Sequence, residues 1–280
     1  AKPDHERPVR NRFGKRKENR PFRGSRMEKR DSISKEKILA VETSGRSLGL
    51  ALAESGESPG IKAEVSFDVG PRHSEILKES CVFLLDKCGW DRKDLTMLAV
   101  STGPGSFTGL RVGIAFTRAL SQFLSIPLIG IPSFEIISAG IGRTRDVPLI
   151  VLIDSIGGEV FVGRVNPDSA IPSEPYRPWP LPRLFEKLKS SPAVLFAGGG
   201  FLRHQKEIGE KLGPRALSVS GEQNFPRAGW LARLALEKAK RSRPASDSWK
   251  TVVPFYLRSP VAVERLNYRK KKAAKEGPQA

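Results

Sequence analysis

The segment 101–113, with the sequence Ser-Thr-Gly-Pro-Gly-Ser-Phe-Thr-Gly-Leu-Arg-Val-Gly, has the composition of a turn that holds an anion. It follows an apolar run and precedes a helical pattern, and a glycine-rich turn before a helix presents backbone N–H groups to a phosphate or carboxylate. Gly103, Gly105 and Ser106 are therefore candidate anion- or nucleotide-binding residues. The spacing differs from the Walker A loop and from the dinucleotide fingerprint. A tight turn in which Ser106 or Thr108 caps the helix is the alternative interpretation.

Residues that could act as nucleophiles, general bases or metal ligands are few and scattered. The three histidines, His5, His73 and His204, lie far apart in the sequence. His73 directly precedes Ser74, but adjacent residues of a helix point in different directions and do not form a catalytic pair. The sequence therefore predicts no catalytic residue and no metal site.

The elements that would position the glycine-rich turn follow one order twice: a strand, hairpin strands, a helix, a strand and a second helix. Alternating strands and helices predict an α/β fold. The repetition predicts two lobes, 38–140 and 141–260, and the proline-rich stretch 172–182 is interpreted as a surface loop. The predicted strands are 38–44, 47–52, 63–67, 95–101, 127–131, 149–153, 159–165 and 194–197, and the predicted helices are 72–88, 110–124, 181–190 and 228–241.

The helix predicted over 72–88 is apolar on more than one face. Leu77, Cys81 and Leu84 follow a helical spacing, and Ile76 and Phe83 widen the stripe. Because a sheet covers only one stripe of a helix, the second apolar face indicates a partner. The next helix carries small residues four apart, at positions 109, 113 and 117, which permit the close approach of another helix.

The charge of the chain is concentrated at its ends. The net charge is +18, and residues 1–37 hold 14 Lys/Arg against 6 Asp/Glu, while 261–280 hold 6 against 2. Such composition predicts disordered basic tails. Phe13 and Phe22 lie among arginines, a pattern that suits RNA, although a solvated tail without a ligand is equally consistent.

The remaining composition favours the cytoplasm. No apolar run is long enough to span a bilayer, and the N-terminal segment lacks the apolar core of a secretory signal. Cys81 and Cys88 are about 10 Å apart along a helix, too far for a disulfide. They are predicted to be buried thiols of a protein in a reducing compartment.

Five stretches together resemble the bacterial TsaB (YeaZ) family. Segment 103–113 is similar to its Gly-Pro-Gly-Ser-Phe-Thr-Gly-x-Arg-x-Gly signature, and 38–44 to its opening strand. Segment 73–77 is similar to the start of its first long helix, 152–160 to its second-lobe hairpin, and 254–258 to its closing Pro-x-Tyr-Leu-Arg. Two features depart from the family: Glu42 replaces the usual Asp, and the basic tails lie outside its compact core.

This resemblance implies a two-lobed, actin/hexokinase-like fold and a non-catalytic role in making threonylcarbamoyladenosine in tRNA. The chain would pair with a TsaD-like catalytic subunit through two helices of the first lobe. A TsaE-like ATPase and tRNA would join the complex, and a homodimer would form in isolation. TsaD holds a metal through a His pair, whereas Ser133 and Ile137 occupy those positions here. No cofactor is implied beyond weak ATP or ADP binding at a subunit boundary.

The resemblance also selects the partner-binding residues, which lie on the two long helices of the first lobe. They are His73, Ile76, Leu77, Ser80, Cys81, Leu84, Gly109, Val112, Gly113, Phe116 and Leu120. The double substitution of Leu77 and Phe116 by Asp is expected to abolish pairing and to leave the fold intact.

Two other functions stay open from the sequence. Segments 154–158 and 197–201 loosely resemble the phosphate hairpin and adenosine loop of actin-like kinases, so an autonomous small-molecule kinase is one alternative. An adaptor that binds tRNA through its basic tails is the other, and it predicts binding that depends steeply on salt.

Overall fold

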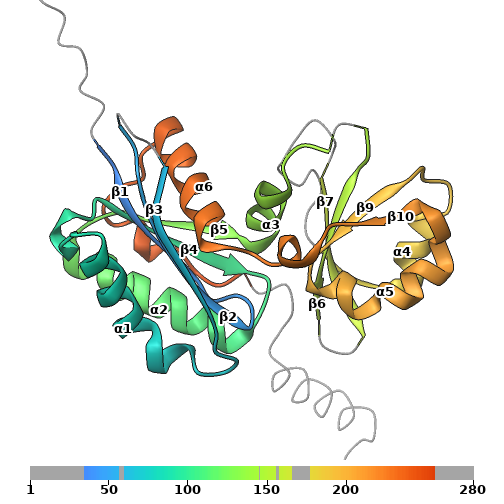
Figure 1. Cartoon of the computed structure of the whole chain (residues 1–280), viewed down its shortest axis with the longest axis horizontal. Helices are drawn as coiled ribbons and strands as arrows, with labels where there is room; N and C mark the ends of the chain where they lie inside the picture. Colours follow the sequence, from blue (N-terminus) through green and yellow to red (C-terminus); the bar gives the residue numbers. More distant parts are fainter. Residues whose placement is uncertain (1–34, 57–59, 145, 156–157, 166–176, 256–280) are drawn as a thin grey trace, which may run out of the picture. The chain divides into compact units, whose positions relative to one another are not determined.

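The computed structural model of the chain describes residues 35–56, 60–144, 146–155, 158–165 and 177–255 (Figure 1). The tails predicted to be disordered, including Phe13 and Phe22, lie outside the described residues apart from 35–37. The same holds for positions 256–258 of the closing motif and for 156–157 in the predicted phosphate hairpin.

The first five strands form one sheet in the order β3-β2-β1-β4-β5. β1 is antiparallel to β2 and parallel to β4, which is in turn parallel to β5. The central strand β1 is buried from Ile38 to Glu42 because residues 38–41 carry apolar side chains on both faces. The strands are β1 (Lys37–Glu42), β2 (Ser47–Glu54), β3 (Gly60–Asp68), β4 (Met97–Gly103) and β5 (Leu128–Pro132).

The second sheet repeats the topology of the first. Its order, β10-β9-β6-β7-β8, gives the same sequence of connections when it is read from β8 to β10. This repetition confirms the predicted two-lobed, actin/hexokinase-like plan. The strands are β6 (Leu149–Asp154), β7 (Glu159–Val165), β8 (Arg177–Pro180), β9 (Val194–Ala197) and β10 (Ala216–Ser218).

The proline-rich stretch that was predicted to be a loop supplies strand β8. Residues 177–180 pair with β7, Trp179 lying opposite Val160. Pro178 and Pro180 are compatible with this strand because β8 is at the edge of the sheet, where a missing N–H costs no ladder bond on the open side.

Helices cover both faces of the first sheet (Figure 1). α1 (His73–Lys87) and α2 (Phe107–Leu124) lie on one face, and α6 (Ala228–Arg241) lies on the other. The sequence had assigned α6 to the second lobe, and this assignment is wrong. Small side chains explain the packing, since Ala228, Ala232 and Ala235 allow the helix to approach the alanine-rich face of β1, β2 and β4 closely.

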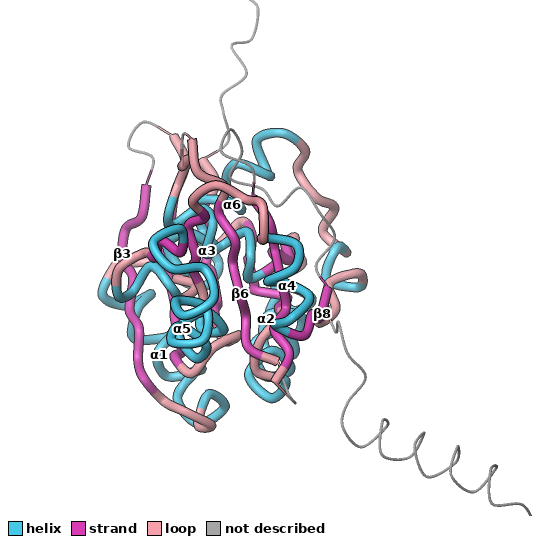
Figure 2. Tube along the Cα trace, turned by 90° about the vertical axis from the view of Figure 1, so that its right-hand side faces the viewer, coloured by secondary structure: helices cyan, strands magenta, loops and turns pink. Residues whose placement is uncertain are grey.

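The second sheet is covered by α4 (Leu181–Leu188) and α5 (Gly199–Leu212) on one face, as can be followed in Figure 2. α3 (Ser133–Ile141) packs on its other face through Phe134 and Ile137. Four short 3-10 helices complete the described elements: η1 (Arg92–Asp94), η2 (Gly213–Arg215), η3 (Gly221–Asn224) and η4 (Ser248–Lys250).

Candidate functional site

The glycine-rich turn joins β4 to α2 and is hydrogen-bonded to the turn after β1. The Ser106 hydroxyl accepts a hydrogen bond from the Gly109 N–H at 3.2 Å, so Ser106 is the N-cap of α2, as predicted. The Ser106 N–H donates to the Ser44 carbonyl oxygen at 2.7 Å. Backbone and side chain of Ser106 are therefore both used within the chain.

Three glycines of this region are required by close packing against the chain itself. A Cβ atom at Gly105 would overlap the Ser44 carbonyl oxygen, and one at Gly109 would overlap the Thr43 carbonyl oxygen. A Cβ at Gly113 would overlap the Thr43 hydroxyl. The small residues of α2 thus receive the β1–β2 turn and not another helix. Gly109 and Gly113, which were predicted to bind a partner, lie inside the fold.

Anion binding at Gly103, Gly105 and Ser106 stays a prediction. Gly103 has a φ of +97°, a conformation that favours glycine, and a Cβ there would lie 2.8 Å from a Leu110 methyl group. Because the N–H groups of Ser106 and Gly109 already have acceptors, an anion would find fewer donors at this turn than its composition indicates.

Glu42 organises the β1–β2 turn from inside the protein. Its side chain is 2% exposed, and its Oε1 accepts hydrogen bonds from the Ser44 N–H at 2.6 Å and the Ser44 hydroxyl at 2.5 Å. Within the described residues, Oε2 is buried without a hydrogen-bond partner. Burial raises the pKa of the Glu42 carboxyl, and the Ser44 hydrogen bonds oppose that rise. Glu42 therefore stabilises the β1–β2 turn from the interior of the protein through its hydrogen bonds with Ser44.

Most of the predicted partner-binding residues of α1 belong to the core of the first sheet. Leu77 is 2% exposed, and Cys81 and Leu84 pack beside it. Ser80 is buried as well, and the His73 ring lies 3.4 Å from the Ser47 carbonyl oxygen. These side chains are not available on the surface of the single chain. An aspartate at Leu77 would therefore disrupt the fold, contrary to the expectation that it leaves the fold intact.

The outer side of α1 and α2 carries a different set of apolar residues. Ile76, Val112, Phe116 and Leu120 are half-buried at the margin of the core. Beyond them, Val82, Phe83 and Phe123 are 60%, 50% and 71% exposed. We call these seven residues, together with the exposed Ala115 and Ala119, the helix face. Of Val82, Phe83 and Phe123, only Phe83 was assigned to an apolar helix face in the sequence analysis. Val82 and Phe123 were not identified because they lie outside the helical stripe that is buried.

Cations border the exposed aromatic rings of these helices. The Lys87 ammonium lies 5.6 Å from the Phe83 ring centre, and the Arg92 guanidinium lies 5.9 Å from that of Phe123.

Cys81 is a free thiol whose pKa is raised by burial to about 12, so it is a poor nucleophile. Cys88 is also free but only half-buried.

The positions compared with kinases and metal enzymes have other partners. The Asp154 carboxylate at the end of β6 pairs with the Arg203 guanidinium of α5 at 2.5 Å. Ser133 and Ile137, at the positions of the metal-binding pair, are both buried. In the described part of the chain, no three His, Cys, Asp or Glu side chains are grouped so as to hold a metal ion. None of the helices described there has the length and apolar character needed to cross a membrane.

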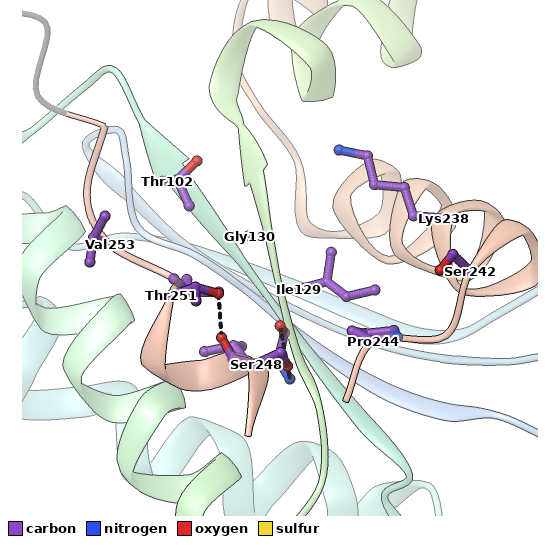
Figure 3. A pocket seen from close by; sticks show the side chains of 11 residues that line it. Thr102, Ile129, Gly130, Lys238, Ser242, Pro244, Ser248, Thr251 and Val253 are labelled. Atoms are coloured by element: carbon purple, nitrogen blue, oxygen red, sulfur yellow. Dashed lines mark hydrogen bonds between the residues drawn. The ribbon is translucent and has the colours of Figure 1, made fainter. Parts of the chain in front are cut away.

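An open hollow of about 420 Å³ follows the edge of β5 (Figure 3). Lys238 and Ser242 line one side of it, and Thr251 lines the other. The Lys238 ammonium is 3.1 Å from the Glu135 carboxylate, so its charge is already paired. The Ser248 hydroxyl accepts a hydrogen bond from the Leu128 N–H and donates one to the Leu128 carbonyl oxygen, at the start of β5. None of the predicted site residues lines this hollow.

Comparison with known proteins supports the resemblance found in the sequence. The family model described as "TsaD: tRNA N6-adenosine threonylcarbamoyltransferase" matches residues 68–168. A Bacillus subtilis protein named tRNA threonylcarbamoyladenosine biosynthesis protein TsaB is 31% identical over 224 residues, which cover 79% of this chain and 93% of that protein. The Escherichia coli protein of the same name is 29% identical over 127 residues, 45% of this chain and 53% of its own length.

The fold is shared with a solved structure. A Pseudomonas aeruginosa protein described as similar to peptidase YEAZ superposes with a TM-score of 0.63. The match covers 80% of this chain and all of the other, at 24% sequence identity, a level that establishes the fold alone.

Proposed function

The chain belongs to the TsaB family of tRNA threonylcarbamoyladenosine biosynthesis proteins, and from this premise we propose that it is a non-catalytic subunit that pairs with a TsaD-like transferase through the helix face. In this role it would hold the catalytic subunit in the conformation that transfers a threonylcarbamoyl group to adenosine next to the anticodon. The observation that carries the proposal is the exposure of large apolar side chains on α1 and α2.

The exposed side chains support docking because water contact with them is costly. Complete burial of a Val or Phe side chain stabilises a protein by about 1.5–3 kcal/mol. Val82, Phe83 and Phe123 lack much of this stabilisation in the single chain because they are exposed. Aromatic residues in the centre of an interface commonly dominate its energy. The exposed Ala115 and Ala119 of α2 add small positions at which a second helix can approach closely.

The similarity to the proposed partner supports the same surface. The TsaD family model matches residues 68–168, and this stretch contains both α1 and α2. Two related chains that each carry this helix pair present similar faces to each other. Such faces can pair about a pseudo-twofold axis, as in the symmetric interfaces of homodimers. A homodimer of this chain would use the same face when no catalytic subunit is present.

A non-catalytic role is supported by the chemistry of the described residues. Cys81 is buried with a raised pKa, and Asp154 is paired with Arg203. Ser133 and Ile137 lack the two imidazoles with which the catalytic relative binds its metal. The threonylcarbamoyl transfer is therefore proposed to occur on the partner, with a TsaE-like ATPase and tRNA in the same assembly. ATP or ADP would bind, if weakly, at a subunit boundary.

Co-purification tests this pairing. The variant Phe83→Asp with Phe123→Asp should no longer co-purify with the TsaD-like subunit, because two charges would be buried in an apolar interface. Both side chains are at least half exposed, so the melting temperature should change little. Phe225→Asp, on a 52% exposed residue outside the helix face, is the matched control and should bind normally. Normal co-purification of the double variant would refute the proposed interface.

A kinase is the competing function, and a titration separates it from the scaffold. Calorimetry of the isolated chain with ATP and Mg²⁺ should give no tight binding if Arg203 keeps Asp154 engaged. Micromolar binding with turnover of a small-molecule acceptor would replace the scaffold proposal by the kinase.

A further inference from the structure

The amino end of the first sheet gathers segments that are distant in the sequence. Because β1, β4 and β5 are parallel, their first residues lie at one end of the sheet. The Arg243 guanidinium, which follows α6, lies 2.6 Å from Glu36. The Lys37 ammonium lies 3.4 Å from Asp94 of η1. η4 reaches the same end through the hydrogen bonds of Ser248 with the first residue of β5.

Basic residues outnumber acidic ones at this end. The cations are Lys35, Lys37, Lys62, Arg92, Lys93, Lys240, Arg241, Arg243 and Lys250, against the carboxylates Glu36, Glu54, Asp91, Asp94 and Asp247. We call these residues, together with Trp90 and Trp249, the basic end.

The carboxylates of the basic end do not neutralise it. The single carboxylate of Glu54 is shared by two ammonium groups, those of Lys35 and Lys62, so it can balance only one of the two charges. Among the described residues, Lys93, Lys240 and Arg241 take part in no ion pair, and all three are exposed to solvent. The excess positive charge is therefore available to an anionic partner.

Aromatic rings are interleaved with these charges. The Lys37 ammonium lies 4.8 Å from the Trp90 ring centre. The Lys250 ammonium and the Arg118 guanidinium each lie 5.8 Å from the centre of the Trp249 ring. Both tryptophans pack partly against the core, so their rings are held in place. Fixed rings beside Lys and Arg side chains are the combination that binds single-stranded nucleic acid, since bases stack while Lys and Arg contact phosphates.

We propose that the basic end is an RNA-binding surface that contacts a single-stranded or loop region of tRNA. It lies at the amino end of the first sheet, whereas the helix face is on the outer side of α1 and α2. The two surfaces meet where Arg92 lies over the Phe123 ring, and their other residues differ, so RNA and a protein partner would be engaged largely by different residues. The choice of tRNA rests on the proposed function, but the surface does not. From the sequence, RNA contact by the tails was one of two open interpretations. Residues 1–34, which precede Lys35, hold 12 Lys/Arg against 5 Asp/Glu.

The test is fluorescence anisotropy of an unmodified tRNA transcript with the isolated full chain, at about 50 to 200 mM salt. Lys240→Glu with Arg241→Glu should weaken binding about tenfold or more and should flatten the dependence of affinity on salt. Lys187→Glu with Lys211→Glu has the same charge change on α4 and α5 and should leave most of the affinity. All four residues are exposed, so melting temperatures should agree.

Three results would overturn the proposal. The first is normal binding by the Lys240→Glu, Arg241→Glu variant, and the second is an equal loss in the control pair. If that first result is accompanied by complete loss of binding on deletion of residues 1–34, RNA binding belongs to the tail alone. The third is competition by polyglutamate that is as effective as competition by RNA, which would show a surface for acidic protein. Because no catalytic subunit is present, these failures are distinct from failure of the helix-face pairing.

Discussion

Replacement of Gly109 by alanine tests how the glycine-rich turn is built. A Cβ at this position would overlap the Thr43 carbonyl oxygen and lie 3.3 Å from the Ser106 hydroxyl oxygen. Thr43 is completely buried, and its carbonyl belongs to the turn that Glu42 holds through Ser44. The overlap can be relieved only if the start of α2 moves away from the β1–β2 turn.

Two opposing effects set the magnitude of the change. Alanine has a helix propensity about 1 kcal/mol better than glycine, which favours the variant. Forcing an extra carbon into a packed interior costs about 1–3 kcal/mol, and more where the neighbour is backbone. The net result should be a decrease of about 1–2 kcal/mol in the free energy of unfolding, since the overlap is with a carbonyl group that has little freedom to move.

Gly209→Ala is the matched control. Gly209 lies within α5, and a Cβ there would meet no atom within 4 Å. This variant should gain about 0.5–1 kcal/mol from propensity alone. Urea unfolding should therefore show midpoints that shift in opposite directions for the two variants, with unchanged slopes. If Gly109→Ala is as stable as Gly209→Ala, the close packing of α2 on the β1–β2 turn is refuted.

Three further predictions concern buried groups. Burial raises the pKa of Glu42 above its ordinary value of 4.5, so the contribution of its protonated form is complete below that pH and is lost as the pH rises through the folded-state pKa. Glu42→Gln should therefore be more stable than the parent at pH 8 but not at pH 4, and equal urea midpoints of the two proteins at pH 8 would contradict this. Leu77→Ala should lower the free energy of unfolding by about 2–5 kcal/mol, whereas Val82→Ala should change it by less than about 0.5 kcal/mol, as measured by urea unfolding. Because the pKa of Cys81 is about 12, iodoacetamide at pH 8 should modify Cys88 and spare Cys81 in the native protein, and mass spectrometry showing rapid Cys81 labelling would oppose its burial.

The sequence was informative wherever local patterns decide structure. The apolar runs predicted β1, β2, β4, β5, β6, β7 and β9, and the capping role of Ser106 followed from its place before a helical pattern. The small residues of α2 were noticed, but what packs on them depends on the distant β1–β2 turn. The repeat of the two sheets was predicted because each unit contains its own order of strands and helices.

Long-range packing accounts for what the sequence did not predict. α6 returns to the first sheet, and neither its apolar stripe nor its alanines reveal which sheet it will cover. α5 was not predicted, because its glycine-rich start lies in the segment 197–201 that was compared with an adenosine loop. Gly198 in fact has a φ of +100° and packs against the Leu152 carbonyl group.

Most of the residues that the sequence analysis proposed for partner binding proved to be buried for the same reason. A helical period identifies the stripe that is buried, but it does not say whether a sheet or another protein buries it. In α1 the chain's own sheet and α2 cover Leu77, Cys81 and Leu84, and this packing leaves Val82 and Phe83 exposed. Exposed positions between buried ones could have been identified from the sequence only with the sheet already in place.

Isothermal titration of the purified chain into the purified TsaD-like subunit, repeated at several temperatures, tests most directly whether the helix face is the docking surface. Association through Val82, Phe83 and Phe123 predicts a negative heat-capacity change, and Phe83→Asp with Phe123→Asp should weaken binding about 30-fold or more. Phe225→Asp should leave both quantities unchanged. Undiminished affinity of the double variant, with the same heat-capacity change as the parent, would contradict the account.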